Sequence, residues 1–121
     1  MNARSQKWTV RLSKAATADF RDILDWTEGE FGTEQALRYE LVLTDAIDAL
    51  TGGPRVAGSR SRSDLLAGLC ILHVARKKHK GRHVLLYSPD NKLVRTIQIL
   101  RILHDSMDFA RHLPKEGGGA P

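Results

Sequence analysis

Two amphipathic segments separated by only Gly32 and Thr33 constrain the fold of this chain most strongly. Apolar residues recur in both at spacings of three and four, the pattern of a helix with one buried face. We predict helices over about residues 16–31 and 34–50, with Ser13 as the first N-cap, Gly32 as a left-handed helix end and Thr33 as the second cap. So short a connection makes the helices run roughly antiparallel, as a hairpin. The apolar face predicted for the first helix comprises Ala16, Phe20, Ile23, Leu24, Thr27 and Phe31.

Strand patterns flank this hairpin on both sides. Residues 8–12 alternate apolar and polar side chains before it, and aliphatic runs follow it at residues 69–75, 83–87 and 93–103. The basic stretch 76–81 ends in glycine and Pro89-Asp90-Asn91 has a tight-turn composition, so both are expected to close hairpins. The prediction is an α+β fold, with an N-terminal strand, a helix hairpin and a three-stranded antiparallel meander that the helices cover. The N-terminal strand is expected to join this sheet.

The length of 121 residues predicts one domain, which we place at residues 1–114. Residues 53–68 are expected to form a long connection pinned by Leu65 and Leu66, and the glycine-rich residues 115–121 a disordered tail. No apolar run approaches the ~20 residues of a membrane span, and the first residues lack the core of a signal peptide. The single cysteine, Cys70, lies in an apolar run and is expected to be a buried, inert thiol. These features predict a cytoplasmic protein without membrane contact.

Charge is divided unevenly along the chain. Residues 13–51 hold 3 basic and 9 acidic side chains, a net of −6, whereas residues 52–112 hold 12 and 4, a net of +8. Residues 1–12 add +3, which gives the formal charge of +5 for the chain. A basic half suggests an anionic partner, either nucleic acid or an acidic polypeptide.

Known catalytic motifs are missing from the sequence. The five histidines show no recognised metal-ligand spacing with Cys70, so neither a metal nor another cofactor is expected. There is no G-x-S-x-G elbow and no phosphate-binding glycine loop. RNA cleavage stays open, because the basic half offers His83, Tyr87 and His104 together with several cationic side chains.

The last aliphatic run stops abruptly at His104 and a compact polar cluster follows it. Arg101 interrupts this run, and an arginine in such a place usually has an acidic partner, here Asp105, Asp108 or a carboxylate of another molecule. Either Asp105 or Ser106 can cap a short helix that begins there. Capping does not account for the arginine and histidine at positions 111 and 112, so we expect the cluster to face a partner.

Several motifs occur together between residues 8 and 114. They are Asp22-Ile-x-x-Trp26, Phe31-Gly32, Gln35-Ala-x-x-Tyr39, Asp64-Leu-x-x-Gly68-Leu69, Arg82-His-x-x-Leu-Tyr87 and Ile99-Leu-Arg-Ile-Leu-His-Asp-Ser-Met-Asp108-x-x-Arg-His-Leu113. In this combination the chain resembles the RelE/ParE superfamily of bacterial type II toxins, and its ParE-like members most closely. One departure is Cys70, which stands where many members carry an arginine.

The resemblance implies a toxin that is encoded beside an antitoxin, whose extended and often acidic C-terminal region wraps it. ParE-like members poison DNA gyrase, whereas RelE-like members cut messenger RNA on the ribosome and often use a C-terminal tyrosine. No tyrosine follows Tyr87, so a non-enzymatic gyrase inhibitor neutralised by a ParD-like antitoxin is favoured, with operon DNA contacted only through the antitoxin. The alternatives are a ribosome-dependent ribonuclease and a degenerate member that binds only its antitoxin.

Two sets of contact residues are predicted on this basis. The residues expected to bind the target are Arg101, His104, Asp108, Arg111 and His112. The residues expected to bind the antitoxin are Trp26, Tyr39, Arg76, Lys77, Lys78 and Arg82.

Overall fold

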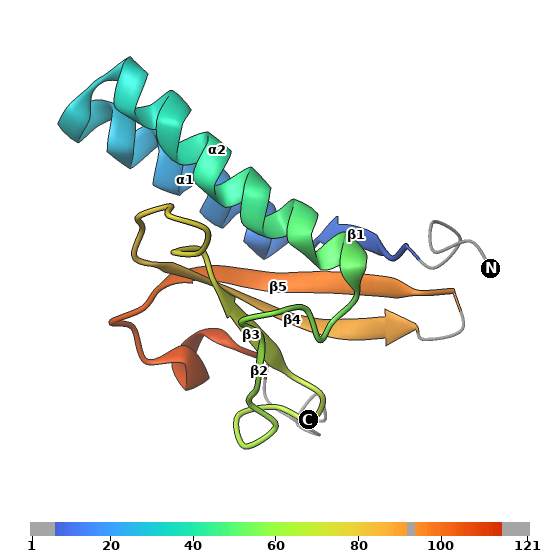
Figure 1. The fold of residues 1–121 in the computed structure, drawn as a ribbon. Helices are drawn as coiled ribbons and strands as arrows, with labels where there is room; N and C mark the ends of the chain where they lie inside the picture. Colours follow the sequence, from blue (N-terminus) through green and yellow to red (C-terminus); the bar gives the residue numbers. More distant parts are fainter. Residues whose placement is uncertain (1–6, 92–93, 115–121) are drawn as a thin grey trace.

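A computed structural model describes residues 7–91 and 94–114, so the predicted disordered tail at 115–121 lies outside the described residues. Within them the chain is α+β, with a helix hairpin on one face of a twisted sheet (Figure 1). The elements are β1 (Thr9–Leu12), α1 (Lys14–Phe31), α2 (Thr33–Ala49), the 3-10 turn η2 (Leu50–Gly52), β2 (Arg60–Ser61), β3 (Cys70–His73), β4 (His83–Asn91), β5 (Thr96–His104) and the 3-10 turn η3 (Phe109–His112).

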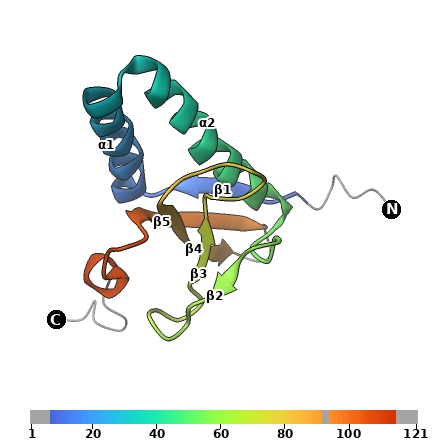
Figure 2. The same ribbon diagram turned by 60° about the vertical axis from the view of Figure 1, so that its left-hand side comes forward.

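The predicted helix hairpin is confirmed, with one correction at its junction. Ser13 Oγ accepts the Ala16 N–H at 3.0 Å as the N-cap of α1, and Gly32 ends that helix with a φ of 96°. Thr33 does not cap α2: it is the first helical residue, and its hydroxyl donates to Glu28 instead. The two helices diverge from their junction toward the sheet (Figure 2).

The sheet has a broader and more mixed topology than the predicted meander. In the described residues its strand order is β1-β5-β4-β3-β2. The predicted antiparallel unit β3-β4-β5 lies at its centre, but β1 joins β5 in parallel and β2 joins β3 from within the predicted irregular connection. The expected joining of the N-terminal strand to the sheet is confirmed. Its parallel pairing with β5 and the existence of β2 depend on contacts with distant segments, which local sequence patterns do not encode.

The predicted turn at Pro89-Asp90-Asn91 is wrong, because β4 continues to Asn91. The ladder between β4 and β5 shifts register between Leu86 and Tyr87 and again between Pro89 and Asn91. Proline has no backbone N–H to donate to the ladder, and a bulge leaves a residue out of the hydrogen-bonded pairing, so the irregularity accommodates Pro89 within the strand. β5 accordingly begins at Thr96 rather than at residue 93.

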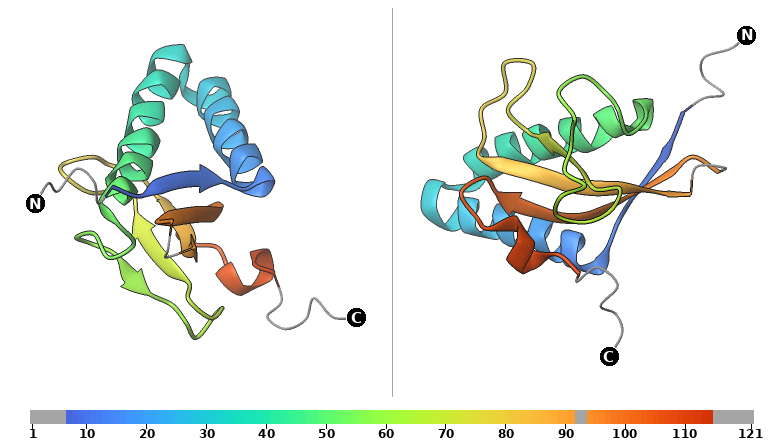
Figure 3. Two further views of the ribbon diagram at one scale, coloured as in Figure 1. Left: turned by 90° about the vertical axis from the view of Figure 1, so that its right-hand side faces the viewer. Right: turned by 90° about the horizontal axis from the view of Figure 1, so that it is seen from below.

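Apolar side chains cover both faces of the sheet. Figure 3 shows the helix hairpin on one side of the sheet and the C-terminal turn η3 on the other. The larger core lies between the sheet and the helices, where Tyr87 is fully buried and donates its hydroxyl proton to the Pro54 carbonyl at 2.7 Å. Cys70 is buried in this core, as predicted, and burial raises the pKa of its thiol. A smaller core on the opposite face includes the pinning residues Leu65 and Leu66. The smaller core is built around Leu69, Val84, Leu86, Leu103 and Leu113.

The helix hairpin extends beyond the end of the sheet (Figure 1). Its tip therefore cannot bury its apolar side chains against strands, and Trp26 and Phe31 are 62% and 64% exposed. Exposed aromatic side chains next to the end of the sheet mark this region as a candidate binding surface.

Candidate functional site

An open groove of about 550 Å³ lies where the overhanging helices meet the sheet end. We call it the Trp26 groove. It is lined by Trp26, Thr27 and Phe31 of α1, Gln35 and Tyr39 of α2, Lys80, Gly81 and Arg82 of the β3–β4 loop, His83 of β4 and His104 of β5. Aromatic rings thus form one wall, while cationic and imidazole groups form the other. Such a mixed groove suits a partner that offers both apolar and anionic groups.

A hydrogen bond joins two residues that line this groove, Tyr39 and His83. The Tyr39 hydroxyl lies 2.6 Å from His83 Nδ1 and accepts the Arg82 backbone N–H at 3.3 Å. Gly81 allows this approach: a Cβ at that position would lie 2.8 Å from the Tyr39 oxygen and 2.8 Å from a Val74 methyl group. The β3–β4 loop is therefore held against α2 by close packing as well as by hydrogen bonding.

Burial, helped by the nearby His104, lowers the pKa of His83 to about 4. At neutral pH the imidazole is therefore uncharged, and its Nδ1 lone pair accepts the Tyr39 proton. Burial is also the main cause of the raised pKa of Tyr39, which keeps the phenol protonated. The pair therefore presents no charge to the groove at neutral pH.

His104 is paired across the β4–β5 ladder with His83, and the two rings meet edge to face at 5.4 Å. The Ser106 backbone N–H donates to His104 Nδ1 at 3.2 Å, and the Ser106 hydroxyl lies 2.7 Å from the same nitrogen. We therefore assign Nδ1 of the neutral ring as the acceptor and Nε2 as the protonated nitrogen. Its side chain is 37% exposed, so it is accessible to a partner.

Asp105 links three strand ends beside the groove. Its carboxylate accepts three hydrogen bonds from the Arg82 guanidinium at 3.1–3.2 Å and one from His73 Nε2 at 2.9 Å. Hydrogen bonds from Arg82, and then from His73, hold the pKa of this carboxyl well below its usual range. Arg82 remains 69% exposed, so part of its guanidinium still faces solvent at the groove rim.

Arg101 of β5 is held against α1 by an unexpected partner, Asp19. Its Nε and Nη2 donate to the two carboxylate oxygens of Asp19 at 2.7 and 2.8 Å, and its Nη1 donates to the His112 carbonyl at 3.2 Å. The expected partners Asp105 and Asp108 make no such contact, because α1 brings Asp19 over β5. Asp19 also accepts the Ile102 N–H at 2.9 Å, so this pair fastens helix, strand and C-terminal turn together.

Comparison with known protein families shows to which family the chain belongs. The family model described as the ParE toxin of the type II toxin–antitoxin system, parDE, matches residues 10–109. The chain belongs to the ParE toxin family. Toxin ParE1 of Mycobacterium tuberculosis (strain H37Rv) is 34% identical over 102 residues, which cover 84% of this chain and 94% of that protein. Toxin ParE1 of Caulobacter vibrioides is 32% identical over 103 residues, covering 85% and 95%.

Solved structures share the ParE-family fold. A chain from the chromosomal ParDE system of P. aeruginosa superposes with a TM-score of 0.62 at 21% identity, covering 82% of this chain and 97% of that one. A chain from the toxin–antitoxin complex RelBE2 of Mycobacterium tuberculosis gives 0.55 at 21% identity, covering 81% and 98%. At this identity the likeness concerns the fold.

Four of the five residues predicted to bind a target line adjoining pockets in this ParE-family chain. His104 lines the Trp26 groove, and together with Arg101 and His112 it also lines a small pocket of about 210 Å³. Arg101 and His112 continue, with Arg111, into a pocket of about 490 Å³ at the start of α1. Arg111 is 83% exposed, with its Nε 3.7 Å from Asp108. Asp108, rather than the predicted Asp105 or Ser106, caps the short turn η3 through the Ala110 N–H.

The residues predicted to bind an antitoxin fall into two groups. Trp26, Tyr39 and Arg82 line the Trp26 groove. Lys77 and Lys78 are exposed on the β3–β4 loop, where both have positive φ angles of 50° and 72°. Arg76 is only 16% exposed and turns toward Asp45 of α2, so it offers little surface to a partner.

Sequence patterns missed several groove residues, of which Phe31 is the clearest. Helical periodicity places it on the buried face, but it is exposed and its ring meets that of Trp26 edge to face at 5.8 Å. Its position next to Gly32, at the tip of the hairpin, is the signal that could have identified it. Lys14, which lines the pocket at the start of α1 together with Arg101 and Arg111, was also missed.

Two further properties concern the part of the chain that the structure describes. There, no three His, Cys, Asp or Glu side chains are grouped in a way that could hold a metal ion. None of the helices in this part is long and apolar enough to span a membrane.

Proposed function

We propose that this ParE-family toxin inhibits DNA gyrase and that a ParD-like antitoxin neutralises it by occupying the Trp26 groove. One observation supports the proposal most. The groove brings together Trp26, Tyr39 and Arg82, expected to bind an antitoxin, with His104, expected to bind the target. A segment seated there would cover His104, so neutralisation would follow from direct competition for one surface.

The chemistry of the groove suits an acidic segment with apolar anchors. Trp26 and Phe31 offer large exposed rings that a partner can desolvate, and such aromatic residues dominate binding energy at many interfaces. Lys80 and Arg82 supply positive charge on the opposite wall, which would speed association with an acidic chain and align it.

The solved relatives support an antitoxin as the partner. One belongs to a ParDE system and the other to a toxin–antitoxin complex, RelBE2. By analogy, we assign the antitoxin of this chain to an adjacent reading frame and contact with operon DNA to the antitoxin. A gyrase target would place the protein in the cytoplasm.

The test adds purified protein to a gyrase supercoiling assay and to a translating extract, with and without the adjacent-frame antitoxin. We expect inhibited supercoiling, restored by stoichiometric antitoxin, and intact messenger RNA. The double variant His104→Ala with Arg111→Ala should lose inhibition, while Arg38→Ala, which removes only an exposed pair with Glu34, should retain it. Unimpaired supercoiling at protein excess, or codon-phased cuts in the messenger, would contradict the proposal.

A further inference from the structure

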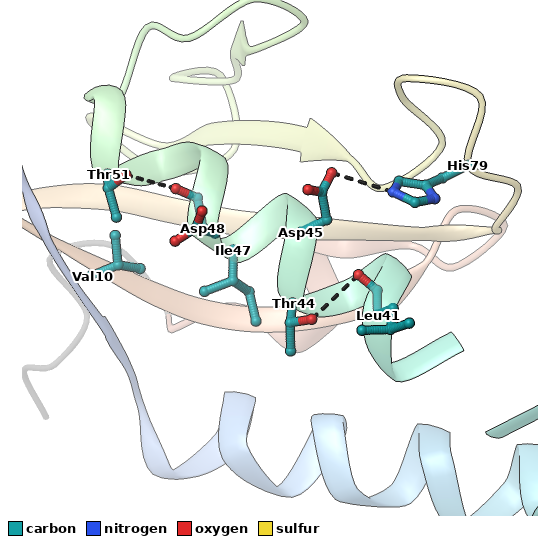
Figure 4. A pocket seen from close by; sticks show the side chains of 8 residues that line it. All are labelled: Val10, Leu41, Thr44, Asp45, Ile47, Asp48, Thr51 and His79. Carbon is teal, nitrogen blue, oxygen red and sulfur yellow. Dashed lines mark hydrogen bonds and ion pairs between the residues drawn. The ribbon is translucent and has the colours of Figure 1, made fainter. Parts of the chain in front are cut away.

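A second open groove, of about 650 Å³, runs along α2 between β1 and the β3–β4 loop (Figure 4). We call it the α2 groove. Its lining comprises Val10, Leu41, Thr44, Asp45, Ile47, Asp48, Thr51 and His79. His79 borders this groove, whereas the neighbouring Lys80 and Gly81 border the Trp26 groove, so the β3–β4 loop separates the two.

An apolar stripe leads into the α2 groove. Leu37 and Leu41 are 58% and 66% exposed, although both lie in the middle of a helix whose opposite face is buried. Leu37, Leu41, Thr44 and Asp48 follow one another at spacings of four, three and four, so they share one face of α2. Single exposed leucines are common on protein surfaces, but two on adjacent turns beside a groove form a continuous surface that another segment can cover.

Two carboxylates line the groove, those of Asp45 and Asp48, and only that of Asp45 has a cationic neighbour among the described residues. Asp45 lies 3.7 Å from Arg76 Nη1 and 3.4 Å from His79 Nε2, and neither contact is a hydrogen bond. Because Arg76 is largely buried against Asp45, its charge offsets that carboxylate. Asp48 is exposed and has no ion-pair partner among residues 7–91 and 94–114. The Asp48 carboxylate therefore lies beside apolar side chains and can pair with one cation of a partner.

We propose that the α2 groove docks an amphipathic segment of a protein partner that carries one arginine or lysine beside leucine-sized side chains. The aliphatic stem of such a cation packs on Val10, Leu41 and Ile47 while its charged end meets Asp48. The partner's apolar residues cover Leu37 and Leu41. This charge preference is opposite to that of the Trp26 groove, so the two surfaces select different segments.

Helix geometry fixes the spacing that the partner needs. Leu37 and Asp48 are eleven positions apart on α2, which corresponds to about 16 Å along the helix axis. In a segment that runs parallel to α2, the partner's cation therefore follows the residue that covers Leu37 by about eleven positions if the segment is helical, or by about five if it is extended.

The test titrates a synthetic helical peptide into the isotopically labelled full chain and follows backbone amide shifts by NMR. The peptide has leucines four positions apart and one arginine eleven positions after the first leucine, on an alanine and glutamine background. The matched peptide carries neutral citrulline in place of arginine. We expect saturable shifts along the α2 groove and about fivefold weaker binding of the citrulline peptide, the scale of a partly screened ion pair.

Variants locate the effect on Asp48. Asp48→Asn should lower the affinity of the arginine peptide to that of the citrulline peptide and leave the latter unchanged, whereas the exposed α1 change Asp25→Asn should alter neither. Circular dichroism checks that both variants keep their helices. Equal affinity of the two peptides, no saturable shift, or shifts around Trp26 and His104 instead would each overturn the proposal. Self-association that depends on Asp48 without peptide would also overturn it, by assigning the groove to a second copy. None of these outcomes depends on gyrase.

Discussion

Asp19 and Arg101, 82 residues apart in sequence, join the first helix to the last strand through hydrogen bonds of 2.7 and 2.8 Å. The same carboxylate accepts the Ile102 backbone N–H, and the same guanidinium donates to the His112 carbonyl. The side chains are only 13% and 25% exposed, so losing one partner leaves the other poorly solvated. This pair therefore contributes to stability before any role in binding is considered.

We predict that Asp19→Asn lowers the free energy of unfolding by about 2–3 kcal/mol, because a half-buried guanidinium then lacks its charged partner. Urea denaturation followed by circular dichroism measures the change. Asp25→Asn, an exposed carboxylate change on the same helix, should stay within about 0.5 kcal/mol. Similar decreases in the free energy of unfolding for the two variants would show that the Asp19–Arg101 pair does not stabilise the fold more than an exposed carboxylate does.

The contact also affects how the target surface should be tested. Replacing Arg101 removes the hydrogen bonds that join α1, β5 and η3. An Arg101 variant would therefore lose stability as well as any contact with the target, and its activity would not separate the two effects. Arg111 is exposed and His104 is partly exposed, and neither side chain is hydrogen-bonded to a distant segment, which makes them the better positions for separating binding from stability.

We predict opposite effects for two glycine substitutions. Gly81→Ala should destabilise the fold by about 1–3 kcal/mol, because the new Cβ would collide with Tyr39 and Val74. Gly29→Ala should stabilise it by about 0.5–1 kcal/mol, since nothing lies within 4 Å of its Cβ position and alanine favours the helix. Thermal unfolding of both variants beside the wild type provides the measurement. A neutral Gly81→Ala would mean that the β3–β4 loop is not packed as described.

Local patterns predicted the helices, the N-cap Ser13 and the central antiparallel strands, because each depends on neighbours in sequence. They could not reveal that β1 pairs in parallel with β5, that β2 exists, or that Asp19 is the partner of Arg101, since these contacts join distant segments. Phe31 shows the same limit in reverse: its spacing is that of a core residue, but the hairpin overhang leaves it exposed. The Trp26 groove likewise depends on how four separate segments meet.

We predict that acid destabilises the protein partly through His83. Its pKa is about 4 in the folded state, against about 6.5 for an unperturbed histidine. Below about pH 6.5 the unfolded chain therefore binds this proton more readily, and stability falls as the pH drops toward 4. Asp105 stays ionised in this window, because hydrogen bonds from Arg82 and His73 lower the pKa of its carboxyl.

The variant His83→Gln isolates this contribution, because the glutamine carbonyl can still accept the Tyr39 hydrogen bond. Between about pH 7.5 and pH 4.5 the wild type should lose about 1–2 kcal/mol more stability than the variant, after allowance for solvent screening. Urea denaturation at the two pH values gives the difference, and His79→Gln serves as a control on an unrelated histidine. An equal loss in wild type and His83→Gln would rule out this origin.

The last prediction separates binding from stability at the Trp26 groove. Because Trp26 is 62% exposed, Trp26→Ala should change the free energy of unfolding by less than about 1 kcal/mol. It should nevertheless weaken antitoxin binding at least about tenfold, because a desolvated aromatic anchor supplies much of the affinity at an interface. Calorimetric titration with the adjacent-frame antitoxin measures the loss. Met107→Ala removes another exposed apolar side chain, 46% exposed and outside this groove, and should leave the affinity within about threefold. If both variants bound as tightly as the wild type, the antitoxin would have to neutralise the toxin from another face of the molecule.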